Sequence, residues 1–301
     1  MLGYCCICLG VNDGRRKKDE ISVNRGMVRR TFDAKGLAYV SELVQLNLRD
    51  TLSVLKWNKA NDIYVYRMSS DSFPWMSEYE FDQLPEWSKI NKQLVEIGNY
   101  VKSENMRVSY HPGPFTVLAS ENEDVVRRSI NELNKHAQLM DYMLLEQSTK
   151  YAINIHINTT KPTNELAARR FCDNFSLLSN SAKAHLTIEN DDKLSQYSVK
   201  MLYNMIHKVI GIPIVFDQFH YKFGPNDQTM EDALKLAVST WKEMPLTHMS
   251  SSRTIEDPKA RITAHADYIY EKIETFGLTF DTEIEAKGKD IALIKYRKDN
   301  K

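Results

Sequence analysis

The sequence carries no excess of either charge. Its 301 residues include 40 Lys and Arg against 40 Asp and Glu, so the formal net charge is zero. A balanced protein has no overall attraction for nucleic acid or an anionic membrane, so binding to either would depend on a local basic surface. No apolar run approaches the roughly 20 residues that a membrane-spanning helix needs, and the first residues do not resemble a signal peptide. We therefore expect a cytoplasmic protein that does not bind membranes.

The sequence is also poor in cysteine. It has four, Cys5, Cys6, Cys8 and Cys172, and their spacing lacks the paired C-x2-C units of a zinc ribbon. Three of them lie in an apolar segment that is typical of a strand, which favours buried thiols over a disulfide framework. Thiols of this kind fit a reducing compartment.

Histidines and carboxylates, by contrast, repeatedly follow short apolar runs. Intervals of about 28 to 45 residues separate them, and each is long enough for one strand-plus-helix unit. In a (β/α)8 barrel the carboxyl ends of the strands converge on one mouth, where these enzymes carry out their chemistry. The spacing therefore predicts metal ligands at a barrel mouth. The positions are His111, His156, Glu189, Asp217, His248 and Glu285.

Strand-like and helix-like segments alternate along the whole chain, which predicts an α/β fold, a single (β/α)8 TIM-barrel domain over residues 1–301. The expected strands are 2–9, 62–68, 106–110, 152–157, 185–189, 212–217, 246–250 and 280–286. The expected helices are 41–57, 84–104, 121–147, 163–180, 194–209, 229–243 and 258–276.

The predicted donors indicate the class of reaction. Imidazole and carboxylate ligands together suit Zn2+ or Mn2+, and a bridging carboxylate brings two ions to about 3.5–4 Å from each other. Such pairs serve phosphodiester hydrolysis, but sugar isomerases also hold two divalent ions at a barrel mouth. A basic rim with aromatic side chains favours nucleic acid. The loops expected at the mouth carry Arg15, Arg16, Lys17, Lys18, Arg253, Lys287 and Lys289 together with Phe73, Trp75 and Phe115.

The chain resembles the UV damage endonucleases, which are barrel relatives of the endonuclease IV group. The resemblance covers nearly the whole chain and implies a DNA repair endonuclease that nicks directly 5′ to a UV photoproduct and leaves a 3′-hydroxyl. The expected substrate is UV-damaged double-stranded DNA, bound by a monomer at the nucleoid. The motifs that carry the resemblance are Leu2-Gly-Tyr4, His111-Pro-Gly113, the His156 strand, Ile188-Glu-Asn-Asp191, Asp217-x-x-His220, His248-x-Ser250, Ala264-His265-Ala266 and Glu285-Ala-Lys-Gly-Lys289.

The resemblance also implies three divalent ions, commonly manganese, with zinc as the alternative. The ligands of the three ions would be, in order, His111, His156 and Glu189; Glu189, Asp217, His248 and Glu285; and His220 with His265. Glu189, Glu285 and His248 would be the catalytic residues. Asp267 would either complete the third site or cap a helix.

A second set of residues is expected to contact DNA or the lesion: Tyr4, Arg15, Arg16, Trp75, Pro114, Phe115, Lys287 and Lys289. Tyr4 would stack beside a flipped dimer. For three of these positions another role stays open. The cluster from Arg15 to Lys18 could be a solvated loop, Trp75 could pack within its own loop, and Lys287 could balance Glu285.

Four positions depart from the family pattern. Glu78 stands where the family often has a histidine, and Leu246 where a lysine, carboxylated in some members, precedes the strand-seven histidine. Pro114-Phe115 replaces a Gln-Tyr pair that probes the strand opposite the lesion, and Cys8 replaces an asparagine of the lesion pocket. The alternatives are an apurinic endonuclease of the endonuclease IV type, a sugar isomerase or epimerase with a similar barrel, and a non-catalytic binder of damaged DNA.

Overall fold

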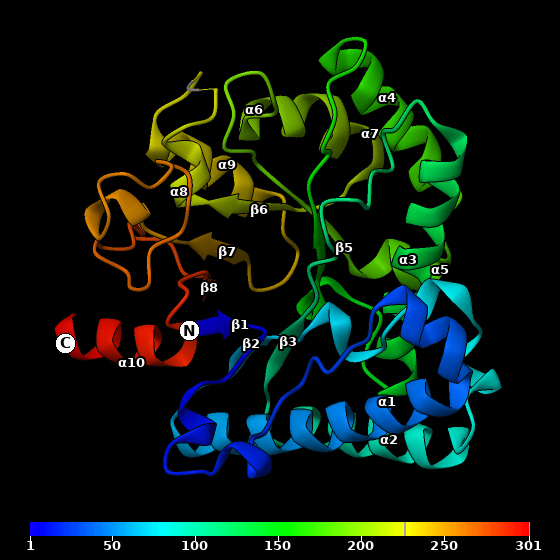
Figure 1. The fold of residues 1–301 in the computed structure, drawn as a ribbon. Coiled ribbons are helices and arrows are strands. Elements are labelled where there is room, and N and C mark those ends of the chain that lie inside the picture. The colour runs from blue at the N-terminus through cyan, green and yellow to red at the C-terminus, as the bar shows by residue number, and fades with distance from the viewer. Residues whose placement is uncertain (226, 301) are drawn as a thin grey trace.

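Eight parallel strands form a barrel in the computed structural model, which describes residues 1–225 and 227–300 (Figure 1). The strands are β1 (Leu2–Cys5), β2 (Val65–Arg67), β3 (Arg107–Ser109), β4 (Ile153–Ile155), β5 (Leu186–Glu189), β6 (Ile214–Asp217), β7 (Leu246–Met249) and β8 (Asp281–Ile284). Their order is β3-β2-β1-β8-β7-β6-β5-β4. An isolated parallel bridge between Tyr110 and Ile153 joins the two ends of this order, so the predicted (β/α)8 barrel is confirmed.

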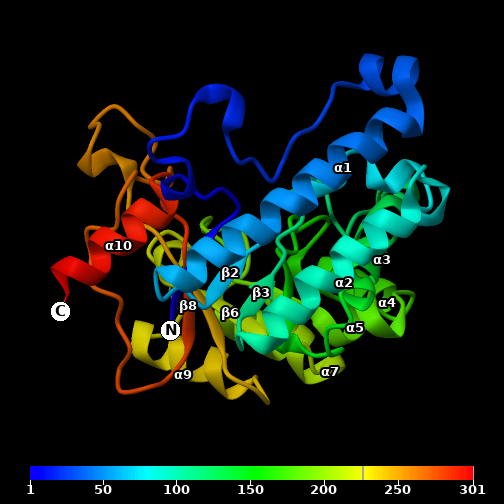
Figure 2. The same ribbon diagram turned by 90° about the horizontal axis from the view of Figure 1, so that it is seen from below.

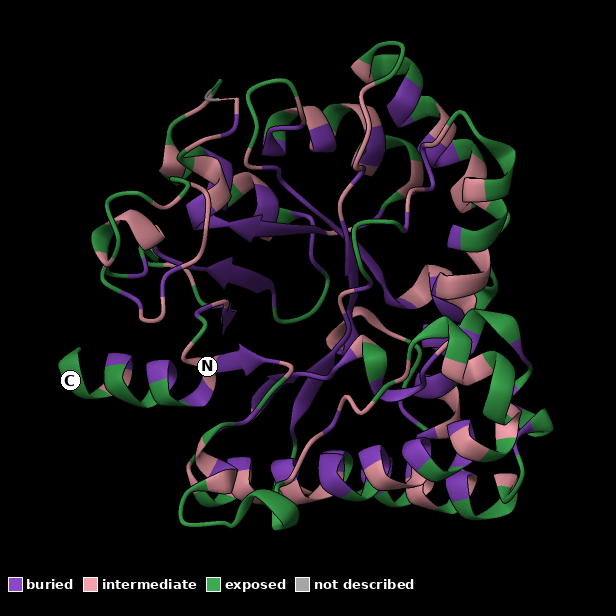
Figure 3. Cartoon of the chain, in the orientation of Figure 1, coloured by how far each residue is buried: buried purple, intermediate pink, exposed green. Residues whose placement is uncertain are grey.

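Helices surround the barrel on its outer side (Figures 1 and 2). They are α1 (Arg29–Ala60), α2 (Trp87–Ser103), α3 (Glu123–Tyr142), α4 (Asn164–Phe175), α5 (Asn180–His185), α6 (Val199–Leu202), α7 (Lys208–Ile210), α8 (Gln218–Tyr221), α9 (Met230–Ser239) and α10 (Lys289–Asp299). Each long helix turns apolar residues at helical spacing toward the strands, as Val40, Val44, Leu48 and Leu55 do in α1. Burial is therefore continuous over the strands and striped along the helices (Figure 3).

The helix predicted over 258–276 is wrong. That segment is irregular, and only the short turn Arg253–Ile255 precedes it. Its backbone donors find acceptors on distant side chains instead of helical carbonyls: the amide of Ile273 donates to the Tyr296 hydroxyl (2.9 Å) and that of Glu274 to Gln218 (2.9 Å). Because these contacts satisfy the backbone without a helix, the apolar spacing was misleading.

Other predicted helices differ in extent. Helix α1 begins twelve residues earlier than predicted and contains a non-helical residue, Gly36, at φ 60°. The helix predicted over 163–180 ends at Phe175 as α4, and a separate helix, α5, begins at Asn180 because Ser179 caps it by accepting a hydrogen bond from the amide of Ala182 (3.1 Å).

The interior of the barrel is divided into a largely apolar floor, which also holds the buried ion pair of Arg107 with Asp281, and a polar upper layer. Side chains alternate along each strand, so every second residue points inward. Val65, Ala152, Val215 and Leu246 pack together as one buried cluster with Trp241. Two residues further along the same strands stand the polar residues Arg67, Asn154, Asp217 and His248. The polar layer therefore faces the mouth at the carboxyl ends of the strands. In the described part of the chain no helix is long and apolar enough to cross a membrane.

Candidate metal centre

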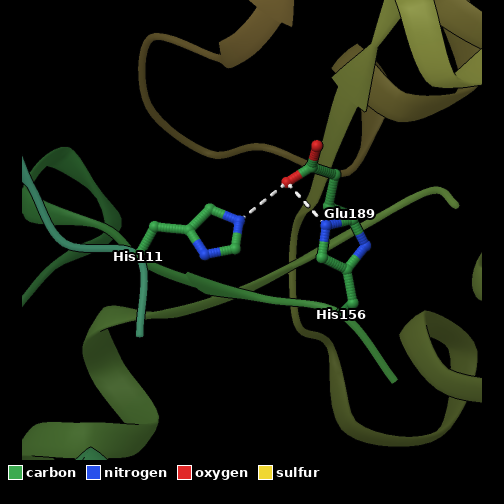
Figure 4. Close-up of side chains that lie close together, drawn as sticks. All are labelled: His111, His156 and Glu189. Carbon is green, nitrogen blue, oxygen red and sulfur yellow. Dashed lines mark hydrogen bonds and ion pairs between the residues drawn. The ribbon is translucent and has the colours of Figure 1, made fainter. Parts of the chain in front are cut away.

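Glu189 lies in the middle of the barrel mouth and belongs to two groups of possible ligands. It ends β5, and its Oε2 lies 3.2 Å from Nε2 of His111 and 3.5 Å from Nε2 of His156 (Figure 4). His111 follows β3 and His156 follows β4, so three neighbouring strand ends supply the first group. One ligand atom from each residue lies within 4.8 Å of the others, which is close enough for all three to bind one ion.

The second group consists of Glu189, Asp217 and His248, whose ligand atoms also lie within 4.8 Å of one another. Nδ1 of His248 lies 3.1 Å from Oε2 of Glu189 and 3.5 Å from Oε1 of Glu285. The structure therefore brings together all the residues predicted for the first and second ions. Because Glu189 has two oxygens and belongs to both groups, it is placed as a bridging ligand would be.

Four of the histidines are oriented by contacts of their Nδ1 atoms. Nδ1 of His111 lies 3.2 Å from the carbonyl of Pro112, and Nδ1 of His156 lies 3.2 Å from Oδ1 of Asp191. His220 and His265 use Nδ1 in the same way, at 3.0 Å from the carbonyl of Asn190 and 2.9 Å from that of Glu285. A histidine that donates from one ring nitrogen presents the other as a lone pair, which is the usual arrangement around a metal.

Asp217 is held by the backbone so that one of its oxygens remains available. It ends β6, and its Oδ1 accepts hydrogen bonds from the amides of Phe219 (2.7 Å) and His220 (2.8 Å) at the start of α8. Its Oδ2 is buried and has no hydrogen-bond partner among the described residues, and the same is true of Oε1 of Glu189. Two buried carboxylate oxygens without donors would be costly unless a cation binds them. These residues therefore fit a divalent metal ion.

The ionisation of the cluster supports the same conclusion. Burial opposes charge on Glu189, yet His248 and His156 hold its pKa well below the usual value. Burial also opposes the charge on His156, but Glu189 and Asp191 raise its pKa to about 9. The pKa of His248 rises to about 10 because the attraction of Glu189 exceeds the cost of burial and the repulsion of Arg67. In the absence of a metal ion the carboxylates therefore keep His156 and His248 protonated. The positive charge of these two rings then balances the carboxylates as a metal ion would.

The two ligands predicted for a third ion do not complete a group. His220 and His265 have ring centroids 6.4 Å apart, and the described residues contain no third set of three donors. The nearby Asp267 is paired with Arg253 at 2.7 Å and caps no helix of the described chain. Glu78 forms an ion pair with Arg29 at 3.2 Å. At position 246 the side chain is a leucine of the apolar floor, so it supplies no charge.

Sequence reasoning missed two charged residues below the predicted ligands, Arg67 and Glu283. Arg67 ends β2 and donates from Nε to Oε2 of Glu283 (2.8 Å) and from Nη1 to Oε1 of Glu285 (2.5 Å). Both residues are buried. A usable signal was the alternation of strand β8, in which Glu283 must face the same side as Glu285.

Comparison with known proteins places the chain in a family. The family model described as UV-endonuclease UvdE matches residues 1–301. The UV DNA damage endonuclease of Bacillus cereus (strain G9842) is 32% identical over 84% of this chain and 80% of its own length. That of Clostridium perfringens (strain 13 / Type A) is 28% identical over 98% of this chain and 69% of its own length.

The chain belongs to the UvdE family. The predicted resemblance is confirmed, and with it the prediction that the protein is an endonuclease. The crystal structure of SacUVDE matches with a TM-score of 0.84 and 30% identity over 99% of this chain and 96% of that chain. Endonuclease IV from Thermus thermophilus, at 12% identity, a TM-score of 0.56 and coverage of 82% and 93%, is similar in fold alone. The same holds for D-psicose 3-epimerase from Clostridium cellulolyticum, at 11% identity, a TM-score of 0.54 and coverage of 79% of each chain.

In this UvdE family member several of the residues predicted to contact DNA are exposed, whereas Phe73 is buried. Phe115 is 91% exposed, and Pro114 beside it is also exposed. Arg15, Arg16 and Lys287 are exposed, and Lys289 is partly so. The loop after β1 lies against the start of α10, because Asp290 accepts hydrogen bonds from the amides of Leu9 (2.6 Å) and Gly10 (2.7 Å). These contacts join the loop after β1 to the start of α10.

Two predicted lesion contacts are placed differently. Tyr4 is fully buried on the outer side of β1, where its hydroxyl donates to Asn58 of α1 (2.7 Å), so the prediction that it stacks on a flipped base is wrong. Cys8 is also buried. Trp75 is half-buried and donates from Nε1 to the carbonyl of Met27 (3.0 Å), while Arg29 covers its ring at 5.5 Å. Packing against the start of α1 and the segment before it therefore accounts for Trp75 without DNA.

Proposed function

We propose that this protein is a metal-dependent endonuclease of DNA repair that cuts the phosphodiester bond directly 5′ to UV photoproducts such as pyrimidine dimers. The cut would leave a 3′-hydroxyl from which repair synthesis can start. The observation that supports this best is the position of Glu189, which is shared by two ligand groups at the mouth of a UvdE-family barrel. The names of its relatives, UV DNA damage endonucleases, supply the substrate. We infer that the protein works in the cytoplasm, at the nucleoid, as a monomer.

Each of the grouped residues has a role in this proposal. His111 and His156 would bind one ion together with Glu189, while Asp217, His248 and Glu285 would bind a second that Glu189 shares. His220 and His265 border the same cluster, with Nδ1 of each already bound to a carbonyl. Divalent ions, which we expect to be Mn2+, would supply an activated water and neutralise charge on the phosphate. Glu189, Glu285 and His248 are the residues that we assign to catalysis, because they converge on the same small volume.

The rim would bind the DNA. Arg15, Arg16, Lys287 and Lys289 would supply positive charge for the phosphates, which provide most of the affinity. Phe115 is the exposed aromatic tip that can enter the duplex and stack where a damaged pair is displaced. Because Phe115 and Pro114 carry no side-chain hydrogen-bond donor, recognition by this loop would depend on shape.

A nicking assay tests the proposal directly. UV-irradiated and untreated supercoiled plasmids are incubated with the protein, with Mn2+ or with a chelator, and open-circle product is measured. We expect nicking that requires both the lesion and the metal. Glu189→Gln should abolish nicking and retain binding to irradiated duplex, whereas Glu231→Gln, which changes an exposed acid of α9, should have no effect. Equal nicking of irradiated and untreated plasmid would refute the lesion specificity.

The same assay separates the alternatives. A plasmid with abasic sites, tested beside the irradiated one, would identify an apurinic endonuclease by faster cutting. Turnover of free ketoses would identify an epimerase. Binding to irradiated DNA without nicking under any metal would identify a non-catalytic binder.

A further inference from the structure

Glu283 is a buried carboxylate beneath the metal centre that no predicted role uses. It lies in β8, two residues before Glu285, and its side chain points into the barrel. Its Oε1 accepts a hydrogen bond from the hydroxyl of Ser109 at the end of β3. Its Oε2 accepts one from Nε of Arg67 at 2.8 Å and lies 3.4 Å from Nε2 of His248. Glu283 therefore connects side chains from β2, β3 and β7.

The contacts of His248 differ from those of His111 and His156, the histidines of the first ligand group. In His111 and His156 the Nδ1 atom contacts a backbone carbonyl or a carboxylate outside the ligand groups, and Nε2 faces Glu189. In His248 the roles of the two nitrogens are exchanged. Nε2 lies 2.7 Å from Nη2 of Arg67 and 3.4 Å from Glu283, and Nδ1 faces Glu189 and Glu285.

We propose that Glu283 is a positioning residue of the metal centre. Together with Arg67 it holds Nε2 of His248, so that Nδ1 of His248 faces the ion that Glu189 also binds. The proposal rests on the proposed function, since it gives a role at the same metal centre. Arg67 only donates hydrogen bonds and Glu283 only accepts them, so together they hold Nε2 in either state of its proton. A carboxylate or carbonyl behind a ligand histidine is the usual means of fixing the ring around a metal.

Glu283 also fixes the position of Arg67. The guanidinium of Arg67 contacts both Glu285 and His248, two residues assigned to the second ion, so without a carboxylate beside it its positive charge would repel a divalent ion. Because Nε of Arg67 is bound to Glu283, the positive charge of Arg67 is balanced by the negative charge of Glu283 below the cluster. The carboxylate also adds a negative charge near the ion. Orientation and charge therefore both predict that removing Glu283 weakens metal binding.

The test measures metal binding without DNA. Protein freed of metal by a chelator is titrated with Mn2+ in a calorimeter, for the wild type and for Glu283→Gln, which keeps the shape and removes the charge. We expect the affinity for one ion to fall roughly ten- to a hundredfold, while the ion held by His111 and His156 binds as before. Nicking by Glu283→Gln should recover when Mn2+ is raised to saturation.

Asp281 offers a matched control. It lies in the same strand two residues earlier, is also buried, points to the same interior and pairs with an arginine, Arg107, at 3.1 Å. Asp281→Asn should lower the melting temperature and leave both Mn2+ affinities unchanged. If Glu283→Gln does not fold, Ser109→Ala removes the other partner of the carboxylate, and we expect a smaller loss of affinity for the same ion.

The outcomes are distinct for the two proposals. Wild-type Mn2+ affinities in Glu283→Gln, or in Ser109→Ala where the first variant does not fold, would overturn the positioning role and leave the proposed function intact. An equal loss in Asp281→Asn would also overturn it, because the effect would then be general destabilisation. Failure of the wild type to bind Mn2+, or any divalent ion, would overturn the metal-dependent function itself.

Discussion

Nη1 of Arg253 lies 2.7 Å from Oδ1 of Asp267. The carboxylate nearest in sequence to His265 is therefore already paired with a cation. Among the described residues, the acids beside His220 and His265 are Glu189, Asp217 and Glu285, which are already assigned to the first and second ions. An ion bound by two neutral imidazoles alone would keep its full charge, which is unfavourable compared with the mixed sites beside it.

We therefore predict two tightly bound divalent ions per chain. Metal-free protein is loaded with Mn2+, passed through a desalting column and analysed by mass spectrometry for metal content. Arg253→Gln releases Asp267 from its partner and should allow a third ion to bind weakly, because a carboxylate then becomes available near His265. Three ions retained by the wild type would contradict this prediction.

Metal binding should release protons at neutral and mildly alkaline pH. The pKa of His156 is raised to about 9 and that of His248 to about 10 in the metal-free protein, so both rings carry protons at pH 7.5. Bound metal requires an unprotonated nitrogen. Mn2+ titrations at pH 7.5 in buffers of different ionisation enthalpy should report about two protons released. No dependence on the buffer would show that these rings are already neutral.

The same shifts predict how the stability of the metal-free protein depends on pH. A histidine whose pKa is raised in the folded state stabilises fully below its unfolded pKa of about 6.5, and this contribution is lost as pH rises through 9 to 10. The pKa of Glu283 is lowered to about 2, mainly by Arg67 against the effect of burial, so its contribution is lost only as pH falls from about 4.5 toward 2. Urea unfolding in a chelator should therefore show stability falling between pH 7 and 10. Saturating Mn2+ should remove most of that fall.

Phe115 should affect recognition and not folding. Its side chain is 91% exposed, so Phe115→Ala removes little buried surface and should change the unfolding free energy by less than about 0.5 kcal/mol. Preference for irradiated over untreated duplex should fall, as measured by competition binding with Glu189→Gln as the common background. Leu177→Ala, which shortens another exposed apolar side chain far along the sequence, serves as the control.

Asp290 should be a major stabilising residue of the mouth. It is completely buried and accepts both amide hydrogen bonds of Leu9 and Gly10. Asp290→Ala leaves two part-buried donors without their acceptor, and we expect a loss of roughly 1–3 kcal/mol, since a fully buried unsatisfied donor costs about 1–3 kcal/mol and water can reach these amides in part. Denaturant unfolding measures this loss. Asp299→Ala, at the exposed end of the same helix, should cost less than about 1 kcal/mol.

The fold and the ligand groups could be predicted because both depend on local pattern. A histidine or acid directly after an apolar run must lie at a strand end, and parallel strands bring their ends together, as His111, His156 and Glu189 show. It was harder to predict whether a strand residue points into the barrel or outward, because this depends on the register of the strand. Tyr4 stands between the inward positions of Gly3 and Cys5, so it points outward to α1.

Contacts between distant segments could not be predicted. The backbone of 258–276 is satisfied by Gln218 and Tyr296, which no local window contains. Arg67 appeared to be an ordinary strand residue, because its partners Glu283 and Glu285 lie more than two hundred residues away. Only the closed barrel, which places β2 near β8, makes them neighbours.

The barrel closes between β3 and β4 through the bridge of Tyr110, whose amide donates to Ala152 (2.8 Å) and whose carbonyl accepts from the amide of Asn154 (2.9 Å). His111 and His156 continue these same two strands, so an ion bound by both would span the seam like a clasp. The chemistry of the site and the closure of the cylinder would then be coupled. We expect amide hydrogens at this seam to exchange faster when metal is withdrawn, while the opposite wall, where β7 and β8 pair along their length, keeps its protection.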